Sequence, residues 1–208
     1  MANLNELKQA VKDGDLDTAV DLTKEALAEK TEPQDILNKG LIAAMDEIGE
    51  LFSKNEIYIP EMMIAARAMK SAMEILEPVL VQAGVKPLGN FVIGTVAGDQ
   101  HDIGKNLVAI MMKGTGFKVF DLGVDVPIEK FIEEAKAANA DVIGISTLLT
   151  TTMPVMAEVV KAAKQAGVKS KIMVGGAPLT QAFAEKIGAD GYAPDAASAV
   201  LVAKDLVA

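Results

Sequence analysis

The 208-residue sequence has no cysteine and no tryptophan, and its only histidine is His101. Without cysteine, the chain cannot form a disulfide, a zinc finger, an iron–sulfur cluster or a thiol nucleophile. With one histidine, a single chain cannot supply a site that needs two imidazoles. His101 could still serve as one axial ligand to a metal that is already held in a macrocycle.

Basic residues are also few, with 20 lysines and arginines against 29 acidic residues and a net charge of −9. This balance argues against a footprint on a phosphate backbone, so we expect no nucleic-acid partner. The sequence has no run of about 18 apolar residues, and its first 15 residues lack the apolar core of a signal peptide. We therefore expect no membrane association and a cytoplasmic location. Half of the residues are apolar, which excludes disorder over most of the chain.

The first 85 residues predict a four-helix bundle. Asp15 can cap one helix, and Pro33 and Pro60 suit the first turns of two others. Apolar residues recur every three or four positions over 37–52 and 62–80, which is typical of helices packed in a bundle. This half carries 8 basic and 16 acidic residues, so we expect its outer surface to be solvated or to meet basic partners.

Apolar runs alternate with helical patterns after a linker at 86–90. The runs cover 91–96, 117–123, 141–146, 171–176 and 190–193. Five strand–helix repeats predict an α/β, Rossmann-like (flavodoxin-like) domain at 91–208 with a five-stranded parallel sheet. The predicted organisation is a helical domain at 1–85, the linker, and this α/β domain.

Chemically informative residues follow three of the predicted strands. These are the loop from Gly98 to Gly104, the loop at 146–152, and Gly175-Gly176. Ligands of parallel sheets bind outside the carboxyl ends of the strands, where the three segments converge. Asp99 could hold one nitrogen of His101 and orient the other toward a metal or a proton, although a lone histidine is more often an ordinary surface or core residue.

The same three segments resemble cobalamin-binding domains. Asp99-Gln100-His101-Asp102-Ile103-Gly104 matches the Asp-x-His-x-x-Gly signature, Ser146-Thr147-Leu148 matches Ser-x-Leu, and Gly175-Gly176 matches Gly-Gly. Residues 48–78 are similar to the helical cap of cobalamin-dependent methionine synthase, which also occurs in the small corrinoid proteins of anaerobic methyltransferase systems. The two-domain resemblance covers essentially all of residues 1–208.

This resemblance implies roles for individual residues. His101 would ligate cobalt in place of the cofactor's own base (base-off, His-on), Asp99 would hydrogen-bond the imidazole, and Thr152 would extend this relay. Ser146 and Thr150 would line a slot for the nucleotide tail. The remaining implied cofactor contacts are Gly98, Gly104, Leu148, Gly175, Gly176 and Ala196, with Phe52 and Ile59 over the upper face of the corrin.

By resemblance, the chain would carry a methyl group on cobalt, as methylcobalamin, from a substrate-specific methyltransferase to a second methyltransferase. The acceptor would be tetrahydrofolate or coenzyme M, and a reductive activating protein would be a further partner. The methyl donor stays open among methanol, methylamines, quaternary amines, methyl sulfides and methoxylated aromatics. Alternatives are a cobalamin-dependent sensor, the small subunit of a mutase, and, last, a phosphotransfer domain using Asp99 or His101.

Overall fold

The computed structural model describes residues 3–208, which form two compact units. A helical unit runs to Pro87, and an α/β unit holds residues 88–113 and 117–208. None of the helices in these described residues combines the length and hydropathy needed to span a bilayer.

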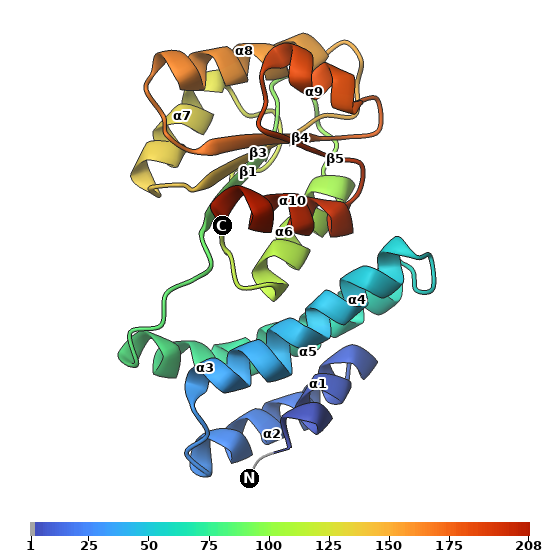
Figure 1. The fold of residues 1–208 in the computed structure, drawn as a ribbon. Helices are drawn as coiled ribbons and strands as arrows, with labels where there is room; N and C mark the ends of the chain where they lie inside the picture. Colours follow the sequence, from blue (N-terminus) through green and yellow to red (C-terminus); the bar gives the residue numbers. More distant parts are fainter. Residues whose placement is uncertain (1–2) are drawn as a thin grey trace. The chain divides into compact units, whose positions relative to one another are not determined.

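The helical unit consists of four helical segments joined by short turns (Figure 1). They are α1 (Leu4–Asp13), α2 (Leu16–Ala28), a continuous run of α3 (Pro33–Asp35), η1 (Ile36–Ile42) and α4 (Ala43–Ser53), and α5 (Ile59–Gln82). Asp15 caps α2 by accepting the Thr18 N–H at 3.1 Å, and Pro60 lies in the first turn of α5, as the sequence predicts. The predicted helical N-terminal region is confirmed.

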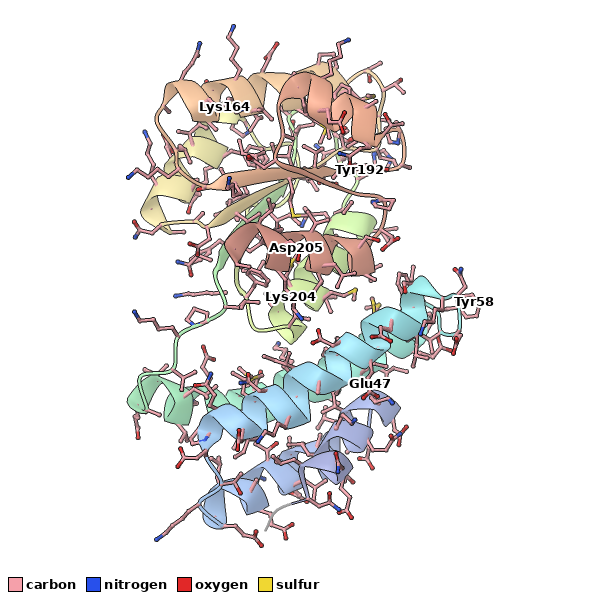
Figure 2. The ribbon with its side chains drawn as sticks, in the orientation of Figure 1. Glu47, Tyr58, Lys164, Tyr192, Lys204 and Asp205 are labelled. Atoms are coloured by element: carbon pink, nitrogen blue, oxygen red, sulfur yellow. The ribbon has the colours of Figure 1, made fainter. Side chains whose placement is uncertain are left out.

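The third segment departs from the predicted regular helix, because η1 is a π-helix inside it. Its Gly40 lies against α1, where an added Cβ would be 2.7 Å from Leu7 Cδ2. The heptad-like apolar spacing gives no sign of this wider turn. Next to it, Lys8 and Lys12 of α1 donate to Glu47 of α4 at 2.7 and 2.5 Å (Figure 2). Hydrogen bonds from Lys12 and then Lys8 lower the pKa of Glu47 below its usual range.

The α/β unit contains one parallel sheet in the order β2-β1-β3-β4-β5. Its strands are β1 (Asn90–Thr95), β2 (Lys118–Asp121), β3 (Val142–Ser146), β4 (Lys171–Gly175) and β5 (Gly191–Ala193). One face of the sheet is covered by helices α7 (Ile128–Ala137), α8 (Met153–Gln165) and α9 (Gln181–Ile187) (Figure 1). The other face is covered by α6 (Ile103–Gly114) and α10 (Ala196–Val207). The predicted five-stranded, flavodoxin-like sheet is confirmed.

The central strands are buried on both faces, which explains why they read as continuous apolar runs. Two strand glycines make room for aromatic rings, since a Cβ at Gly144 would lie 2.7 Å from Phe91 Cζ and one at Gly94 would lie 2.9 Å from Phe131 Cζ. The adjacent strands β1 and β3 lead to helices on opposite faces. This is the topological switch point of the sheet, the place where ligands of open α/β sheets generally bind, outside the carboxyl ends of the strands.

Candidate functional site

The loop after β1 carries His101 to the carboxyl edge of the sheet. Gly98 has a left-handed backbone (φ 83°) that turns the chain, and the next residue, Asp99, donates its N–H to the Val96 carbonyl at 3.1 Å. The buried Thr95 donates its hydroxyl to the His101 carbonyl at 2.9 Å. The backbone of His101 is therefore held from the strand before α6 begins.

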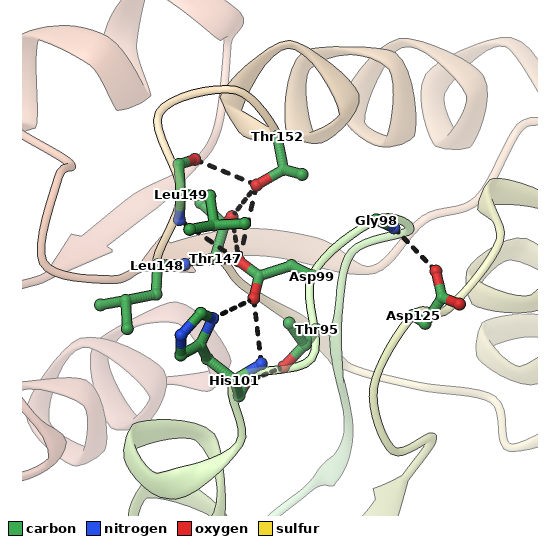
Figure 3. A network of polar contacts seen from close by, with 9 residues as sticks. All are labelled: Thr95, Gly98, Asp99, His101, Asp125, Thr147, Leu148, Leu149 and Thr152. Atoms are coloured by element: carbon green, nitrogen blue, oxygen red, sulfur yellow. Dashed lines mark hydrogen bonds and ion pairs between the residues drawn. The ribbon is translucent and has the colours of Figure 1, made fainter.

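The carboxylate of Asp99 is fully buried, and its Oδ1 faces His101 (Figure 3). Oδ1 accepts the His101 backbone N–H at 3.0 Å and lies 2.7 Å from His101 Nδ1. The structure thus brings together the two residues that the sequence paired from their spacing. Two contacts from one oxygen fix both the backbone and the ring of His101.

The other oxygen, Asp99 Oδ2, accepts hydrogen bonds from the loop that follows β3. Its donors are the Thr147 hydroxyl at 2.7 Å and the backbone N–H groups of Leu148 and Leu149 at 2.7 and 3.3 Å (Figure 3). One carboxylate therefore joins the loops after β1 and β3. The direct hydroxyl partner is Thr147, which the sequence analysis did not single out.

Thr152, the predicted relay residue, lies behind Thr147. The two hydroxyl oxygens are 2.6 Å apart, whereas Thr152 Oγ1 is 3.5 Å from Asp99 Oδ2. Because Thr147 gives its own proton to Asp99, the single hydroxyl proton of Thr152 is donated either to Thr147 Oγ1 or to the Leu149 carbonyl oxygen, 3.0 Å away. Thr152 therefore joins the same network mainly through Thr147. A sequence that reads Ser-Thr-Leu-Leu-Thr-Thr-Thr gives no spacing rule that chooses among these hydroxyls.

The electrostatics keep this carboxylate ionised. Burial by itself raises the pKa of Asp99, but hydrogen bonds from the His101 and Leu148 N–H groups, the Thr147 hydroxyl and the His101 ring outweigh it and hold the pKa well below its usual range. Because an ionised carboxylate can only accept hydrogen bonds, we assign the ring proton of His101 to Nδ1, the nitrogen that faces Asp99. Its Nε2 then carries a free lone pair.

The side chain of His101 is half exposed, and its Nε2 has no hydrogen-bond partner among residues 3–208. Apolar side chains on the same two loops are also exposed, namely Ile103 (75%), Leu148 (43%) and Leu149 (37%). Gly104 is in the first turn of α6 with open space where a Cβ would be. The site thus presents one imidazole nitrogen and bare apolar surface.

The other predicted residues of the α/β unit lie along the same edge of the sheet. Ser146 ends β3 beside Thr95 and is partly buried, and Thr150 is exposed in the loop that follows. Ala196 is buried in the first turn of α10. Gly175 ends β4, where an added Cβ would lie 3.2 Å from the Ala193 carbonyl oxygen.

Gly176 is required by the protein's own backbone. Its φ is 143°, and an added Cβ would lie 1.8 Å from the Thr147 carbonyl oxygen. This contact packs the loop after β4 against the loop that supplies the hydroxyl of Thr147. The expected role of Gly175 and Gly176 in leaving room for a nucleotide tail stays a prediction.

Phe52 and Ile59 lie in the helical unit, on either side of the turn between α4 and α5. Phe52 is half-buried, Ile59 is 40% exposed, and the neighbouring Tyr58 is 66% exposed (Figure 2). Tyr58 and Ile59 are therefore exposed apolar groups at the end of a turn whose other exposed residues, 53–56, are polar or charged. The role of Phe52 and Ile59 over the upper face of a cofactor stays a prediction.

Comparison with known proteins identifies the family of both units. Residues 89–201 and residues 4–77 each match a family model described as a B12 binding domain. The chain is 46% identical over 206 residues to dimethylamine corrinoid protein 3 of Methanosarcina acetivorans, covering 98% of this chain and 96% of that protein. The chain belongs to the family of B12-binding corrinoid proteins.

Solved structures of corrinoid-family proteins share the fold. A cobalamin-binding protein from Desulfitobacterium hafniense is 31% identical, with a TM-score of 0.82 and full coverage of both chains. A chain of the methanol:cobalamin methyltransferase complex from Methanosarcina barkeri is 28% identical with a TM-score of 0.88, covering 98% of this chain and 79% of that one. The resemblance noted from the sequence motifs is therefore confirmed.

The residues at the site fit the cofactor that the corrinoid family implies. A corrinoid brings its own equatorial nitrogens to cobalt, so the protein needs to offer one axial donor. His101 Nε2 could serve as such a donor, because the hydrogen bond between Nδ1 and Asp99 leaves Nε2 free, an arrangement usual for metal-binding imidazoles. The exposed apolar groups of Ile103, Leu148 and Leu149 suit contact with a flat macrocycle.

Proposed function

We propose that this corrinoid protein carries a methyl group between two methyltransferases, with His101 as the lower axial ligand of cobalt in a base-off, His-on arrangement. The observation that carries the proposal is the half-exposed imidazole whose Nδ1 is held at 2.7 Å by the buried Asp99 and whose Nε2 is unpartnered within the described residues. When bound, the corrinoid supplies a cobalt–carbon bond that methyl transfer makes and breaks.

The protein's own residues control the axial nitrogen. Asp99 holds the proton on Nδ1 and so presents the lone pair of Nε2. The Thr147 hydroxyl and the Leu148 N–H keep Asp99 in place by binding its other oxygen, and Thr152 contacts the Thr147 hydroxyl from behind.

The remaining predicted residues complete the proposed cofactor site. Ser146, Thr150, Gly175, Gly176 and Ala196 would border the nucleotide tail, while Gly98 and Gly104 would admit the backbone close to the cofactor. Residues 1–85 would form the cap, with Phe52 and Ile59 over the upper face, and residues 91–208 the binding domain. The support is their common position at the carboxyl edge of the sheet and at the α4–α5 turn.

We further propose partners of three kinds. A first methyltransferase would deliver the methyl group, a second would pass it to tetrahydrofolate or coenzyme M, and a reductive protein would restore the cofactor after oxidation. The relatives favour a methylated amine or methanol as the donor, because they are named for dimethylamine and for methanol:cobalamin methyl transfer. Since the Asp99–His101 pair is committed to the axial ligand, the protein alone should not turn over a free donor.

The ligation is tested by electron paramagnetic resonance of the protein loaded with cob(II)alamin. Because His101 is the only histidine, labelling histidine with ¹⁵N changes a single candidate ligand. The expected result is a nitrogen splitting that changes with the label and disappears in His101→Ala. An unchanged splitting would mean that the cofactor's own base is the ligand. Methyl transfer should then appear only after a methyltransferase is added to the labelled, loaded protein.

A further inference from the structure

The connection between β2 and α7, residues 122–127, is hydrogen-bonded to the loop that carries His101. The Gly98 N–H donates to Asp125 Oδ1 at 2.7 Å (Figure 3), and the Asp125 N–H donates to the Asp99 carbonyl at 3.0 Å. Asp125 therefore binds the backbone of Gly98 and Asp99, and the side chain of Asp99 in turn holds His101. The Gly98–Asp125 contact joins residues 27 positions apart in the sequence, and neither contact was predicted from it.

Both contacts depend on an unusual backbone conformation at Asp125. Its φ is 52°, in the left-handed region, which aspartate, asparagine and glycine tolerate better than other residues. In this conformation the N–H and the side chain of Asp125 both reach the histidine loop. Aspartate suits this position for two reasons: its carboxylate accepts the Gly98 N–H, and its tolerance of a left-handed backbone lets its own N–H reach the Asp99 carbonyl.

A buried lysine anchors the other side of the same loop. Lys105, in the first turn of α6, is 3% exposed, and its Nζ lies 2.7 Å from both carboxylate oxygens of Asp121 at the end of β2. Asp121 Oδ1 also accepts the Gly123 N–H at 2.9 Å. A lysine is rarely buried unless it is paired, so this ion pair is a built feature of the fold.

The lysine is also connected back toward the histidine. Its Nζ donates to Asn106 Oδ1 at 2.7 Å, and Asn106 Nδ2 donates to Asp102 Oδ2 at 2.9 Å. Asp102 directly follows His101. His101 therefore lies between two anchored points, Asp99 on one side and Asp102 on the other, and both are tied to the segment 121–125.

We propose that Lys105, Asp121 and Asp125 are positioning residues that clamp the histidine loop and set how firmly Nε2 of His101 is presented to the cofactor. This inference rests on the proposed function only for the identity of the ligand. None of the three residues needs to touch the cobalt, because each acts through the backbone on either side of His101. Loosening the clamp should weaken the axial ligand before it unfolds the protein.

Three substitutions at Asp125 separate its two contributions. Asp125→Asn keeps an acceptor oxygen and the left-handed preference, Asp125→Gly keeps only the backbone freedom, and Asp125→Ala keeps neither. Lys105→Met removes the ion pair at the other anchor. The matched control is Lys130→Met, which deletes an exposed ion pair with Glu134 on α7 that lies outside the clamp.

Two measurements report on His101 without relying on activity. In cofactor-free protein labelled with ¹⁵N-histidine, nuclear magnetic resonance shows one imidazole, and its tautomer and line width are read directly. In loaded protein, the dissociation rate of cob(II)alamin and its histidine nitrogen splitting are followed. Residues that orient a metal ligand from outside its coordination typically change affinity about 10–100-fold.

We expect Asp125→Ala and Lys105→Met to broaden or mix the tautomers of the free imidazole and to speed cofactor dissociation about 10–100-fold. The dissociation rate and imidazole signals of Asp125→Gly should be intermediate between those variants and the wild type. Both measurements should be at wild-type values in Asp125→Asn and Lys130→Met. If the imidazole signals and the dissociation rate stay at wild-type values in Asp125→Ala and Lys105→Met, the clamp is refuted.

Failure of the ligand assignment is distinguishable from failure of the clamp. If the electron paramagnetic resonance spectrum of the loaded wild type shows no histidine nitrogen splitting, the proposed ligand is wrong. The imidazole signals of the cofactor-free variants still test the clamp in that case. If Lys105→Met does not fold, the exposed Asp125 variants decide alone. A uniform loss of signal in all three Asp125 variants, Asn included, would also overturn the proposal, because Asn preserves the contacts.

Discussion

Replacing Asp99 with asparagine would put an NH₂ group where the structure has an oxygen that only accepts hydrogen bonds. Both oxygens of Asp99 face donors, with His101 on one side and Thr147 and Leu148 on the other. An asparagine must therefore turn its NH₂ toward one of these sets. The His101 side is the less costly choice, because the imidazole can change tautomer and accept the new hydrogen bond.

The magnitude follows from what that orientation leaves unsatisfied. The backbone N–H of His101 loses its buried acceptor, which costs about 1–3 kcal/mol. For a chain of this size each kcal/mol lowers the melting midpoint by about 2–4 °C, so the unfolding of the α/β unit should shift by roughly 2–12 °C. More importantly, an imidazole that accepts at Nδ1 carries its proton on Nε2, and a protonated Nε2 cannot bind a metal.

The decisive assay for Asp99→Asn is the tautomer of His101 in the cofactor-free protein, read from ¹⁵N imidazole shifts, together with cob(II)alamin affinity. We expect the proton to move from Nδ1 to Nε2 and the affinity to fall about 10–100-fold. Asp141→Asn is the matched control, since Asp141 accepts the Asn90 N–H at the opposite edge of the sheet. If Asp99→Asn keeps the proton on Nδ1 and binds like the wild type, the orienting role of Asp99 is wrong.

Three further changes test other parts of the molecule. Gly176→Ala should lower the free energy of unfolding, measured by urea titration, by at least about 2 kcal/mol, because backbone strain and overpacking each cost about 1–3 kcal/mol. Gly123→Ala is the control: Gly123 also has a positive φ but has open space around it, so the loss of unfolding free energy should be smaller. Glu47→Gln should destabilise the helical unit by less than about 1 kcal/mol at pH 7. Because the folded-state pKa of Glu47 is lowered, that difference should be present above about pH 4 and vanish on further acidification, as thermal melts at each pH would show. Phe52→Ala and Ile59→Ala should speed photolysis of bound methylcobalamin more than they lower the melting midpoint; early unfolding with a wild-type quantum yield would assign both residues to the core.

Much of the fold could be predicted because burial leaves a direct trace in the sequence. Strands buried on both faces read as apolar runs, and helix starts are marked by Asp15 and Pro60, whose capping and backbone preferences are local. The π-helix at 36–42 was missed, because its apolar spacing of three and four residues is also that of a regular helix. The pairing of Asp99 with His101 was also local, two residues apart within one turn.

The rest of the site depends on contacts between distant segments. Thr147 was missed because the choice among four threonine hydroxyls depends on where β3 ends and how its loop turns toward Asp99. Asp125 was missed because its partners lie on a different strand's loop. The reason for Gly176 is the carbonyl of Thr147, which only the neighbouring strand brings near. Such contacts become readable only when the strand order is known.

Among residues 3–208, the hydrogen bonds that fix the imidazole of His101 are made within the α/β unit, by residues between Thr95 and Thr152. A displacement of the helical residues therefore breaks none of these bonds and leaves the proton on Nδ1. In thermodynamic terms, these hydrogen bonds contribute no coupling free energy between a movement of the helical unit and the orientation of the His101 imidazole. A perturbation confined to the helical unit should therefore leave the orientation and the tautomer of His101 as they are in the α/β unit alone.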